Sequence, residues 1–308
     1  MKKFLVVLLV LVISIATVFA EGTNEKVSSD SYKVGFIVGS RQHVFYNLIE
    51  EGINSKAAEL GIEAVVLDGQ LDGNVFSDHI NNLVAENCDA IALSCNDPGG
   101  VTPALEAADR DGVPVFTFDC TTTTTDVVKC FVGTDNFAGG YLAGQYAAKI
   151  APEGAKVAAI WDVPQSCVDR YNGWIKAIKE SNKNLKMIDV GQYHGDASKA
   201  ENLMTDALTS NPDINSVFCG GDPAATGALA AVKASGASTK VIGFDGNPES
   251  KAAMLDPING KYWVAEVAQD PVGIGKQITE QIYKYLTTGS VEKKVIMVNP
   301  YIFTAADL

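Results

Sequence analysis

Two apolar runs, one in each half of the chain, end on an aspartate. Residues 114–118 precede Asp119, and residues 241–244 precede Asp245. Apolar runs rich in β-branched and aromatic residues predict strands buried on both faces of a parallel sheet. Ligands of such sheets bind beyond the carboxyl ends of the strands, where an unpaired buried carboxylate is costly. The two aspartates therefore predict two lobes that each point an acid into one cleft. The alternative for each is a cap on the following helix.

Strand-like and helix-like segments alternate over nearly the whole chain from residue 33, with short loops between them. This alternation predicts an α/β protein of two doubly wound, Rossmann-like lobes with parallel central sheets and right-handed crossovers. The first boundary is expected near residues 133–135. The chain has 308 residues, which is enough for two such domains.

The N-terminus has the features of a secretory signal peptide over residues 1–20. Lys2 and Lys3 form the charged region, residues 4–15 the apolar region, and cleavage is expected after Ala20. The alternative is an uncleaved membrane anchor. Residues 21–31 are polar and are predicted to be a disordered leader. A periplasmic location follows from this prediction.

The formal net charge is −13. A strongly acidic chain is a poor partner for nucleic acids and for anionic membrane surfaces, so neither is expected.

The cysteines do not form a recognisable metal or redox motif, because no pair has CxxC spacing. Cys120 with Cys130 is the most plausible disulfide, and the alternative is a set of buried free thiols. The six cysteines are Cys88, Cys95, Cys120, Cys130, Cys167 and Cys219.

Motifs for catalysis are not found in the sequence. It has no GxxxxGK[ST] loop, no GxSxG elbow and no HExxH helix. The glycines at 139, 140 and 144 fall inside a predicted helix, so they are interpreted as close helix packing and not as a dinucleotide site. We therefore expect no enzyme activity, no cofactor and no metal.

Several short stretches together carry a resemblance to a known family. They are residues 39–46, 114–119, 135–136, 170–174, 241–248 and 268–271. With these, the chain resembles the periplasmic sugar-binding proteins of ABC importers, and within them the ribose-binding-protein group, from about residue 32 to 298. Repressors of the LacI type share the fold, but the signal peptide, the acidic charge and the missing helix-turn-helix exclude them.

The resemblance implies a venus-flytrap, in which two lobes joined by a three-strand hinge close on one ligand. The crossovers would fall near residues 133–135, 267–269 and 295–298. The N-terminal lobe would then comprise residues 32–134 plus 269–295, and the C-terminal lobe residues 135–268 plus 296–308. A monomer is expected.

Two aromatic residues and an acid of the first lobe match the family's binding residues. Phe45 and Tyr46 match a pair that packs on a sugar ring, and aromatic faces suit the apolar side of a sugar. Asp119 matches a carboxylate that accepts hydrogen bonds from sugar hydroxyls. Each aromatic residue has a core role as its alternative.

Three residues of the second lobe and the hinge complete the match. Arg170 matches an arginine whose planar fork donates to sugar oxygens, Asp245 a second carboxylate, and Gln269 an amide at the hinge. The alternatives are a surface charge for Arg170 and a hinge-stabilising hydrogen bond for Gln269.

The chain departs from the family at several of these positions. Cys120 replaces an arginine, His43 replaces an asparagine, and Gly221 replaces the asparagine ahead of the acid Asp222. The aromatic residue of the second lobe falls near residues 194–195. These losses enlarge the pocket and argue against ribose, in favour of a hexose, a polyol or a modified sugar. Trp161 and Asp162, at the end of a second-lobe strand, are expected to fill part of the space, and the alternative for Trp161 is a core role.

The predicted function is therefore a binding protein that captures a small saccharide and delivers it to an ABC permease. The alternative keeps the fold but binds a nucleoside or another small signal for a chemoreceptor or sensor kinase. Such ligands also carry vicinal hydroxyls, so the two acids do not distinguish the alternatives.

Overall fold

The computed structural model describes residues 31–95 and 97–308. The signal peptide predicted for residues 1–20 lies outside these residues, as does the predicted leader apart from Ser31. Within the described part of the chain, no helix is both long enough and apolar enough to cross a membrane.

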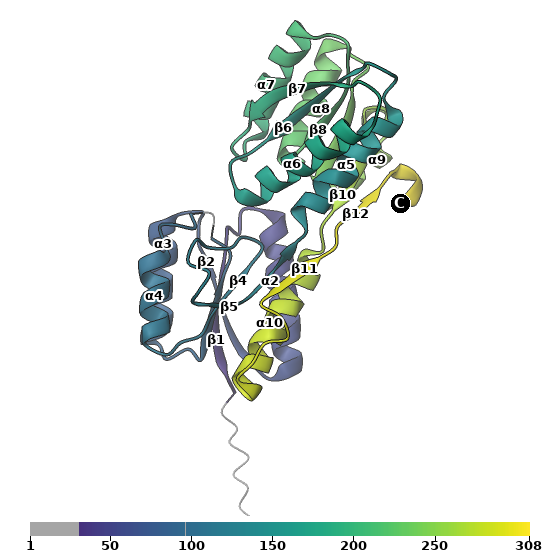
Figure 1. The fold of residues 1–308 in the computed structure, drawn as a ribbon. Helices are drawn as coiled ribbons and strands as arrows, with labels where there is room; N and C mark the ends of the chain where they lie inside the picture. The colour runs from purple at the N-terminus through teal and green to yellow at the C-terminus, as the bar shows by residue number, and fades with distance from the viewer. Residues whose placement is uncertain (1–30, 96) are drawn as a thin grey trace, which may run out of the picture. The chain divides into compact units, whose positions relative to one another are not determined.

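The first sheet has the strand order β11-β5-β4-β3-β1-β2, and all its strand pairs are parallel. Helices α2 and α10 cover one face and α3 and α4 the other (Figure 1). The strands are β1 (Lys33–Val38), β2 (Glu63–Asp68), β3 (Ala90–Leu93), β4 (Val115–Phe118), β5 (Val128–Thr134) and β11 (Val295–Val298). The helices are α2 (Val44–Leu60), α3 (Gly73–Ala85), α4 (Thr102–Arg110) and α10 (Pro271–Thr288).

The second sheet has the order β12-β10-β9-β8-β6-β7 and is parallel except for β12, which runs antiparallel to β10. Its strands are β6 (Lys156–Trp161), β7 (Lys186–Gln192), β8 (Ile214–Cys219), β9 (Lys240–Asp245), β10 (Trp263–Ala268) and β12 (Tyr301–Phe303). Its α-helices are α5 (Asn136–Ile150), α6 (Gln165–Glu180), α7 (Ala197–Ser210), α8 (Asp222–Ser235) and α9 (Pro248–Leu255). Two 3₁₀ turns are η1 (Asn259–Lys261) and η2 (Ala305–Asp307).

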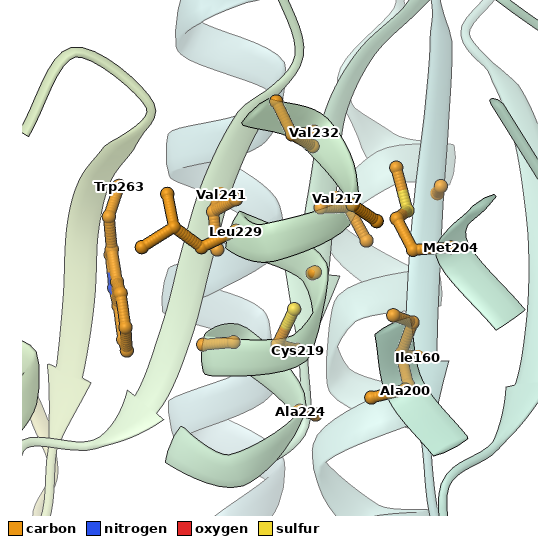
Figure 2. Close-up of a cluster of buried hydrophobic side chains, with 14 of the residues drawn as sticks. Ile160, Ala200, Met204, Val217, Cys219, Ala224, Leu229, Val232, Val241 and Trp263 are labelled. Atoms are coloured by element: carbon orange, nitrogen blue, oxygen red, sulfur yellow. The ribbon is translucent and has the colours of Figure 1, made fainter. Parts of the chain in front are cut away.

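Each sheet is buried between two layers of helices, which explains its continuous apolar strands. In the second sheet, α5 and α6 pack on one face and α7 and α8 on the other. Figure 2 shows the core on the α7 and α8 side, where Met204, Val217 and Leu229 meet. The predicted fold class, two doubly wound parallel α/β lobes, is confirmed.

The chain passes between the two sheets three times. It leaves β5 for α5 at Asp135, leaves β10 for α10 at residues 269–270, and leaves β11 for β12 at residues 299–300. The lobe limit predicted between residues 295 and 296 falls inside β11, all of whose residues pair with β5. Residues 296–298 therefore belong to the first sheet. The ladder ends before Pro300, which has no N–H to continue it.

Candidate ligand-binding site

A cavity of about 330 Å³ lies beyond the carboxyl ends of the strands of both sheets. Its size falls in the range of small-molecule sites, ~300–1,000 Å³. Seven of the nine residues predicted for the ligand site line it: His43, Phe45, Tyr46, Asp119, Arg170, Asp245 and Gln269.

The two predicted acids adopt an uncommon backbone conformation. Asp119 follows β4 with φ of 59°, and Asp245 ends β9 with φ of 113°. Positive φ is rare for residues other than glycine and costs of order 1–3 kcal/mol. The helices that follow have Asp135 and Asn247 as their N-cap residues, so the alternative of a cap on the following helix is wrong for both acids. Both side chains line the cavity.

Asp119 is 7% exposed and lies at the wall formed by the first sheet. Its Oδ2 accepts hydrogen bonds from the Ser94 hydroxyl at 3.0 Å and from the Cys120 thiol at 3.4 Å. Burial raises the pKa of Asp119, while the Ser94 hydrogen bond and the charge of Arg170 act in the opposite direction. The carboxyl group is therefore held in place before any ligand arrives.

Phe45 and Tyr46 lie in the first turn of α2, and their ring centroids are 5.5 Å apart with planes at 75°. Tyr46 is 8% exposed and belongs to the core, so the core role considered as its alternative also applies. Its ring rests on Gly39, where any Cβ would overlap the ring. Burial and the charge of Asp119 raise the pKa of Tyr46 well above its usual value, so its hydroxyl stays protonated. His43 begins α2 and packs edge-on to Tyr46.

Arg170 is 5% exposed, so it is not the surface charge considered as its alternative. Its Nε donates to Asn136 Oδ1 at 2.8 Å, and its Nη1 donates to the Gly220 carbonyl at 2.7 Å and to Asp245 Oδ1 at 3.1 Å. The guanidinium carbon lies 3.9 Å from the centre of the Phe244 ring, a cation–π contact. These contacts engage Nε and Nη1 and fix the plane of the guanidinium.

The helix that carries Arg170 packs unusually close to α5. A Cβ at Gly140 would overlap the carbonyl of Arg170, and a Cβ at Gly173 would overlap the carbonyl of Phe137. The interpretation of the glycines at 139, 140 and 144 as close helix packing is confirmed. The approach of the two helices sets the height of Arg170 above the sheet.

Gln269 uses both ends of its amide. Its Nε2 donates to Asp245 Oδ1 at 2.7 Å, and its Oε1 accepts from the Thr134 hydroxyl at 2.6 Å. The hinge hydrogen bond considered as the alternative role of Gln269 is therefore present, although the residue also lines the cavity. Burial raises the pKa of Asp245, and the charge of Arg170 lowers it.

Two predicted site residues lie away from the cavity lining. Trp161 stacks on Tyr171 with ring centroids 4.9 Å apart, and its Nε1 donates to Asp189 at 2.9 Å. Asp222 is 2% exposed and lies behind Asp245, to whose Oδ2 its backbone N–H donates at 3.4 Å. Trp161 therefore does not fill space in the pocket.

Tyr193 lines the cavity but was not predicted from the sequence. A Cβ at Gly221 would lie only 2.6 Å from the Tyr193 hydroxyl, so the glycine makes room for this ring. The space that Gly221 was expected to add to the pocket is thus taken by Tyr193. The family's aromatic position was placed at residues 194–195, where this chain has His194 and Gly195, and Tyr193 brings an aromatic ring into the cavity from the position just before them.

Asp162, which was expected together with Trp161 to fill part of the pocket, lines the cavity and joins two loops. Its Oδ1 accepts from the Val163 N–H at 2.8 Å and its Oδ2 from the Gly195 N–H at 2.9 Å. His194 Nδ1 lies 3.4 Å from Oδ1.

All six cysteines are free, so the disulfide considered between Cys120 and Cys130 is absent and the free-thiol alternative is confirmed. Cys130 is buried in the core under α2 and α10, whereas Cys120 lines the cavity. Cys167 also lines it, and burial raises its pKa to about 11, so it is a neutral thiol. Over residues 31–95 and 97–308, no group of three or more His, Cys, Asp or Glu side chains is arranged to hold a metal ion.

Two α/β lobes that share a cavity lined by carboxylates, a guanidinium and aromatic rings define a class of two-lobed binding proteins. A family model described as a periplasmic binding protein domain matches residues 34–290. The chain belongs to this family, and the resemblance found in the sequence is confirmed.

Curated relatives match most of the chain. The ribose import binding protein of Bacillus subtilis is 30% identical over 264 residues, which cover 86% of this chain and 85% of the relative. That of Salmonella typhimurium is 31% identical, covering 85% and 87%. The D-apiose import binding protein of Paraburkholderia graminis is 27% identical, covering 84% and 83%.

Solved structures share the fold. A periplasmic solute binding protein from Actinobacillus succinogenes with bound D-allose has a TM-score of 0.81 at 24% identity, covering 90% of this chain and 98% of that chain. A solute binding protein from Mycobacterium smegmatis with bound glycerol has a TM-score of 0.80 at 26% identity, covering 90% and 95%.

Proposed function

We propose that the protein captures a small neutral saccharide, a monosaccharide or a polyol, outside the cytoplasm and delivers it to an ABC import permease. The observation that carries this proposal is the array of Arg170, Asp245 and Gln269 in a cavity whose other wall holds Asp119 and Phe45. The import roles printed for the curated relatives support it, and the family supports a periplasmic location.

The chemistry of the cavity favours a ligand rich in hydroxyl groups. The carboxylates of Asp119 and Asp245 accept hydrogen bonds from hydroxyls, and the guanidinium of Arg170 donates to sugar oxygens. Phe45 offers an apolar face to the C–H side of a ring. With Asp162, the cavity is lined by three acidic side chains and one arginine. This excess of negative charge disfavours an anionic sugar.

Binding of this kind needs no chemical step, so the proposal is a binding protein and not an enzyme. Differential affinity of the ligand for one arrangement of the lobes would shift their population, and the permease would recognise that arrangement. A monomer is sufficient for this role. A chemoreceptor that reads the same state is a further proposed partner.

A thermal-shift screen of the exported protein, stripped of carried-over ligand by unfolding and refolding, tests the proposal. The panel holds pentoses, hexoses, polyols and nucleosides. A ligand at 100 times its dissociation constant stabilises the fold by ~2.7 kcal/mol. We expect a stereospecific response to one monosaccharide or polyol. Silence across all sugars would overturn the proposal, and a response to nucleosides alone would favour the sensing alternative.

A further inference from the structure

A pair of buried carboxyl groups lies directly behind the ligand acid Asp245. Glu266 on β10 is fully buried, and its carboxyl group lies against Gly243, where any Cβ would overlap it. Its Oε2 accepts from the Trp263 Nε1 at 2.8 Å, and its Oε1 accepts from the Gly246 N–H at 3.1 Å. Glu266 thus holds the backbone of the residue that follows Asp245.

Asp222, the first residue of α8, holds the next residue of the same loop. Its Oδ2 accepts from the Asn247 N–H at 3.0 Å. Its Oδ1 is buried and has no hydrogen-bond partner among the described residues, and the side chain that interacts with Asp222 at hydrogen-bonding range is the carboxyl group of Glu266. A buried carboxylate oxygen without a donor is costly, so a donor is expected at this position.

Among the described residues, no positively charged side chain acts directly on the pair. Asp245 faces it from β9, Cys219 faces it from β8, and Arg170 on α6 reaches the cluster through Asp245. Burial and the neighbouring acids raise the pKa of Asp222 to about 8 and that of Glu266 well above its usual value. Two like charges this deeply buried cannot both be ionised near neutral pH.

We propose that Asp222 and Glu266 share one proton and act as positioning residues for Asp245, so that ligand affinity falls when this proton leaves at alkaline pH. The inference rests on the proposed function only in that Asp245 binds the ligand. The proton passes to solvent, and no bond other than O–H breaks.

The coupling to the ligand runs through the backbone of residues 245–247. Asp245 has φ of 113°, a strained conformation that persists only where the surroundings enforce it. The two carboxyl groups enforce it by accepting from the N–H groups of Gly246 and Asn247. When both acids are ionised, they repel each other, the hold on the loop weakens, and the Asp245 carboxylate leaves its place beside Arg170 and Gln269.

Asp222→Asn is the decisive variant because it mimics the shared proton. The amide oxygen keeps the hydrogen bond from Asn247, and the amide N–H donates toward Glu266. The matched control is Asp196→Asn, an exposed acid at the start of α7 in the same lobe, whose role as a cap an asparagine preserves. Glu266→Gln supplies the donor from the other side if Asp222→Asn does not refold.

The first measurement needs no ligand. Infrared difference spectra of the whole exported protein at about pH 6.5 and about pH 9.5 bracket the Asp222 pKa of about 8. We expect the C=O band of protonated carboxyl groups to lose intensity between the lower and the higher pH in the wild-type protein, and to lose less in Asp222→Asn. No such loss in the wild-type protein would overturn the shared proton.

The second measurement is calorimetric titration with D-ribose, D-allose and myo-inositol at the same two pH values. For a sugar that binds, the wild-type protein and the Asp196→Asn control should lose roughly tenfold or more in affinity at the higher pH, whereas Asp222→Asn should lose little. His43 and His194 also line the cavity, and this comparison removes their contribution. An equal loss in Asp222→Asn would overturn the positioning role. If none of the three sugars binds while the infrared band behaves as expected, the shared proton stands, and D-ribose, D-allose and myo-inositol are excluded as ligands.

Discussion

Asp119 and Arg170 show how the side chains of the site are held. The protein satisfies part of their hydrogen-bonding capacity, and the rest is open to the cavity. Each has neighbours that fix its orientation, Ser94 for the acid and Asn136 for the guanidinium. Fixed donors and acceptors lose little entropy when a ligand binds, so such preorganisation favours affinity.

Asp119→Asn should weaken sugar binding by roughly tenfold or more without unfolding the protein. The amide still accepts from Ser94 and asparagine tolerates the φ of 59°, so the fold is retained, but a charged acceptor for hydroxyls is lost. Calorimetric titration measures the affinity and circular dichroism the fold. Asp126→Asn, an acid that does not line this cavity, is the control. Unchanged affinity would remove Asp119 from the site.

Arg170→Lys should reduce both affinity and thermal stability. A lysine cannot serve Asn136, Gly220 and Asp245 together, so buried acceptors lose their donor at ~1–3 kcal/mol each. Sugar affinity should fall at least roughly tenfold, and the midpoint of thermal unfolding should fall with it. Lys179→Ala on the exposed face of the same helix should change neither. Wild-type affinity in Arg170→Lys would contradict the role of its planar fork.

For single residues, the sequence correctly placed in the cavity those side chains that directly follow a strand. The prediction failed where the direction of a side chain depends on partners distant in the sequence. Asp119 and Asp245 end apolar runs, and the edge of a parallel sheet brings them together. Trp161 also ends a strand, but Tyr171 stacks on it and Asp189 binds it outside the cavity. Tyr193 enters the cavity because position 221 has no side chain, a dependence that spacing along the chain does not display.

At the scale of elements, the contact between α5 and α6 is fixed by glycines, and Gly173→Ala should destabilise the fold. In an exposed helix the change would stabilise by ~1 kcal/mol, but here the new Cβ overlaps the carbonyl of Phe137, and overpacking costs ~1–3 kcal/mol. Urea unfolding measures the change. Gly99→Ala is the control, since a Cβ at Gly99 meets nothing within 4 Å. Stability equal to wild type would show that the two helices can move apart.

The carboxyl pair between α8 and β10 should make stability depend on pH. The folded-state pKa of Asp222, about 8, lies above its ordinary value of 3.8. The folded chain therefore keeps a proton that the unfolded chain has released, and stability falls as pH rises between these values. Asp222→Asn lacks this dependence. The difference between its free energy of unfolding and that of the wild type should therefore shift in favour of the variant as pH rises to about 8, and stay constant above that pH. Urea unfolding of both proteins across this pH range measures the difference. If the free energies of unfolding of the two proteins change in parallel with pH, the raised pKa of Asp222 is contradicted.

The long elements could be predicted from periodicity, and the short ones near the hinge could not. Strand β6 and helix α7 are elements of the alternation of strand-like and helix-like segments expected from residue 33 onward. Helix α9 has eight residues and no distinct apolar face, so its pattern does not differ from that of a loop. Strand β12 has three residues and pairs antiparallel with β10, which the parallel alternation along the chain does not indicate.

At the scale of the whole molecule, two of the three crossings between the sheets are joined to the site by one amide. Gln269 follows β10, the last parallel strand before the chain returns to the first lobe, and its hydrogen bonds reach Thr134 at the end of β5 and Asp245 at the end of β9. A ligand that contacts Asp245 is therefore one hydrogen-bonded residue away from two of the crossings.

Thr134→Val tests this connection, because Thr134 does not line the ligand cavity yet bonds to a residue that does. The variant leaves the buried Oε1 of Gln269 without its donor, at a cost of ~1–3 kcal/mol, and frees the amide to turn away from Asp245. Sugar affinity should fall several-fold and the unfolding midpoint should drop. Thr117→Val in the adjacent strand β4 is the matched control. Its hydroxyl is buried and has no hydrogen-bond partner in the described part of the chain, so removing it should leave affinity unchanged and stability equal or higher. If the two variants behave alike in both measurements, the hydrogen bond from Thr134 does not orient Gln269, and the crossings and the site are independent of each other.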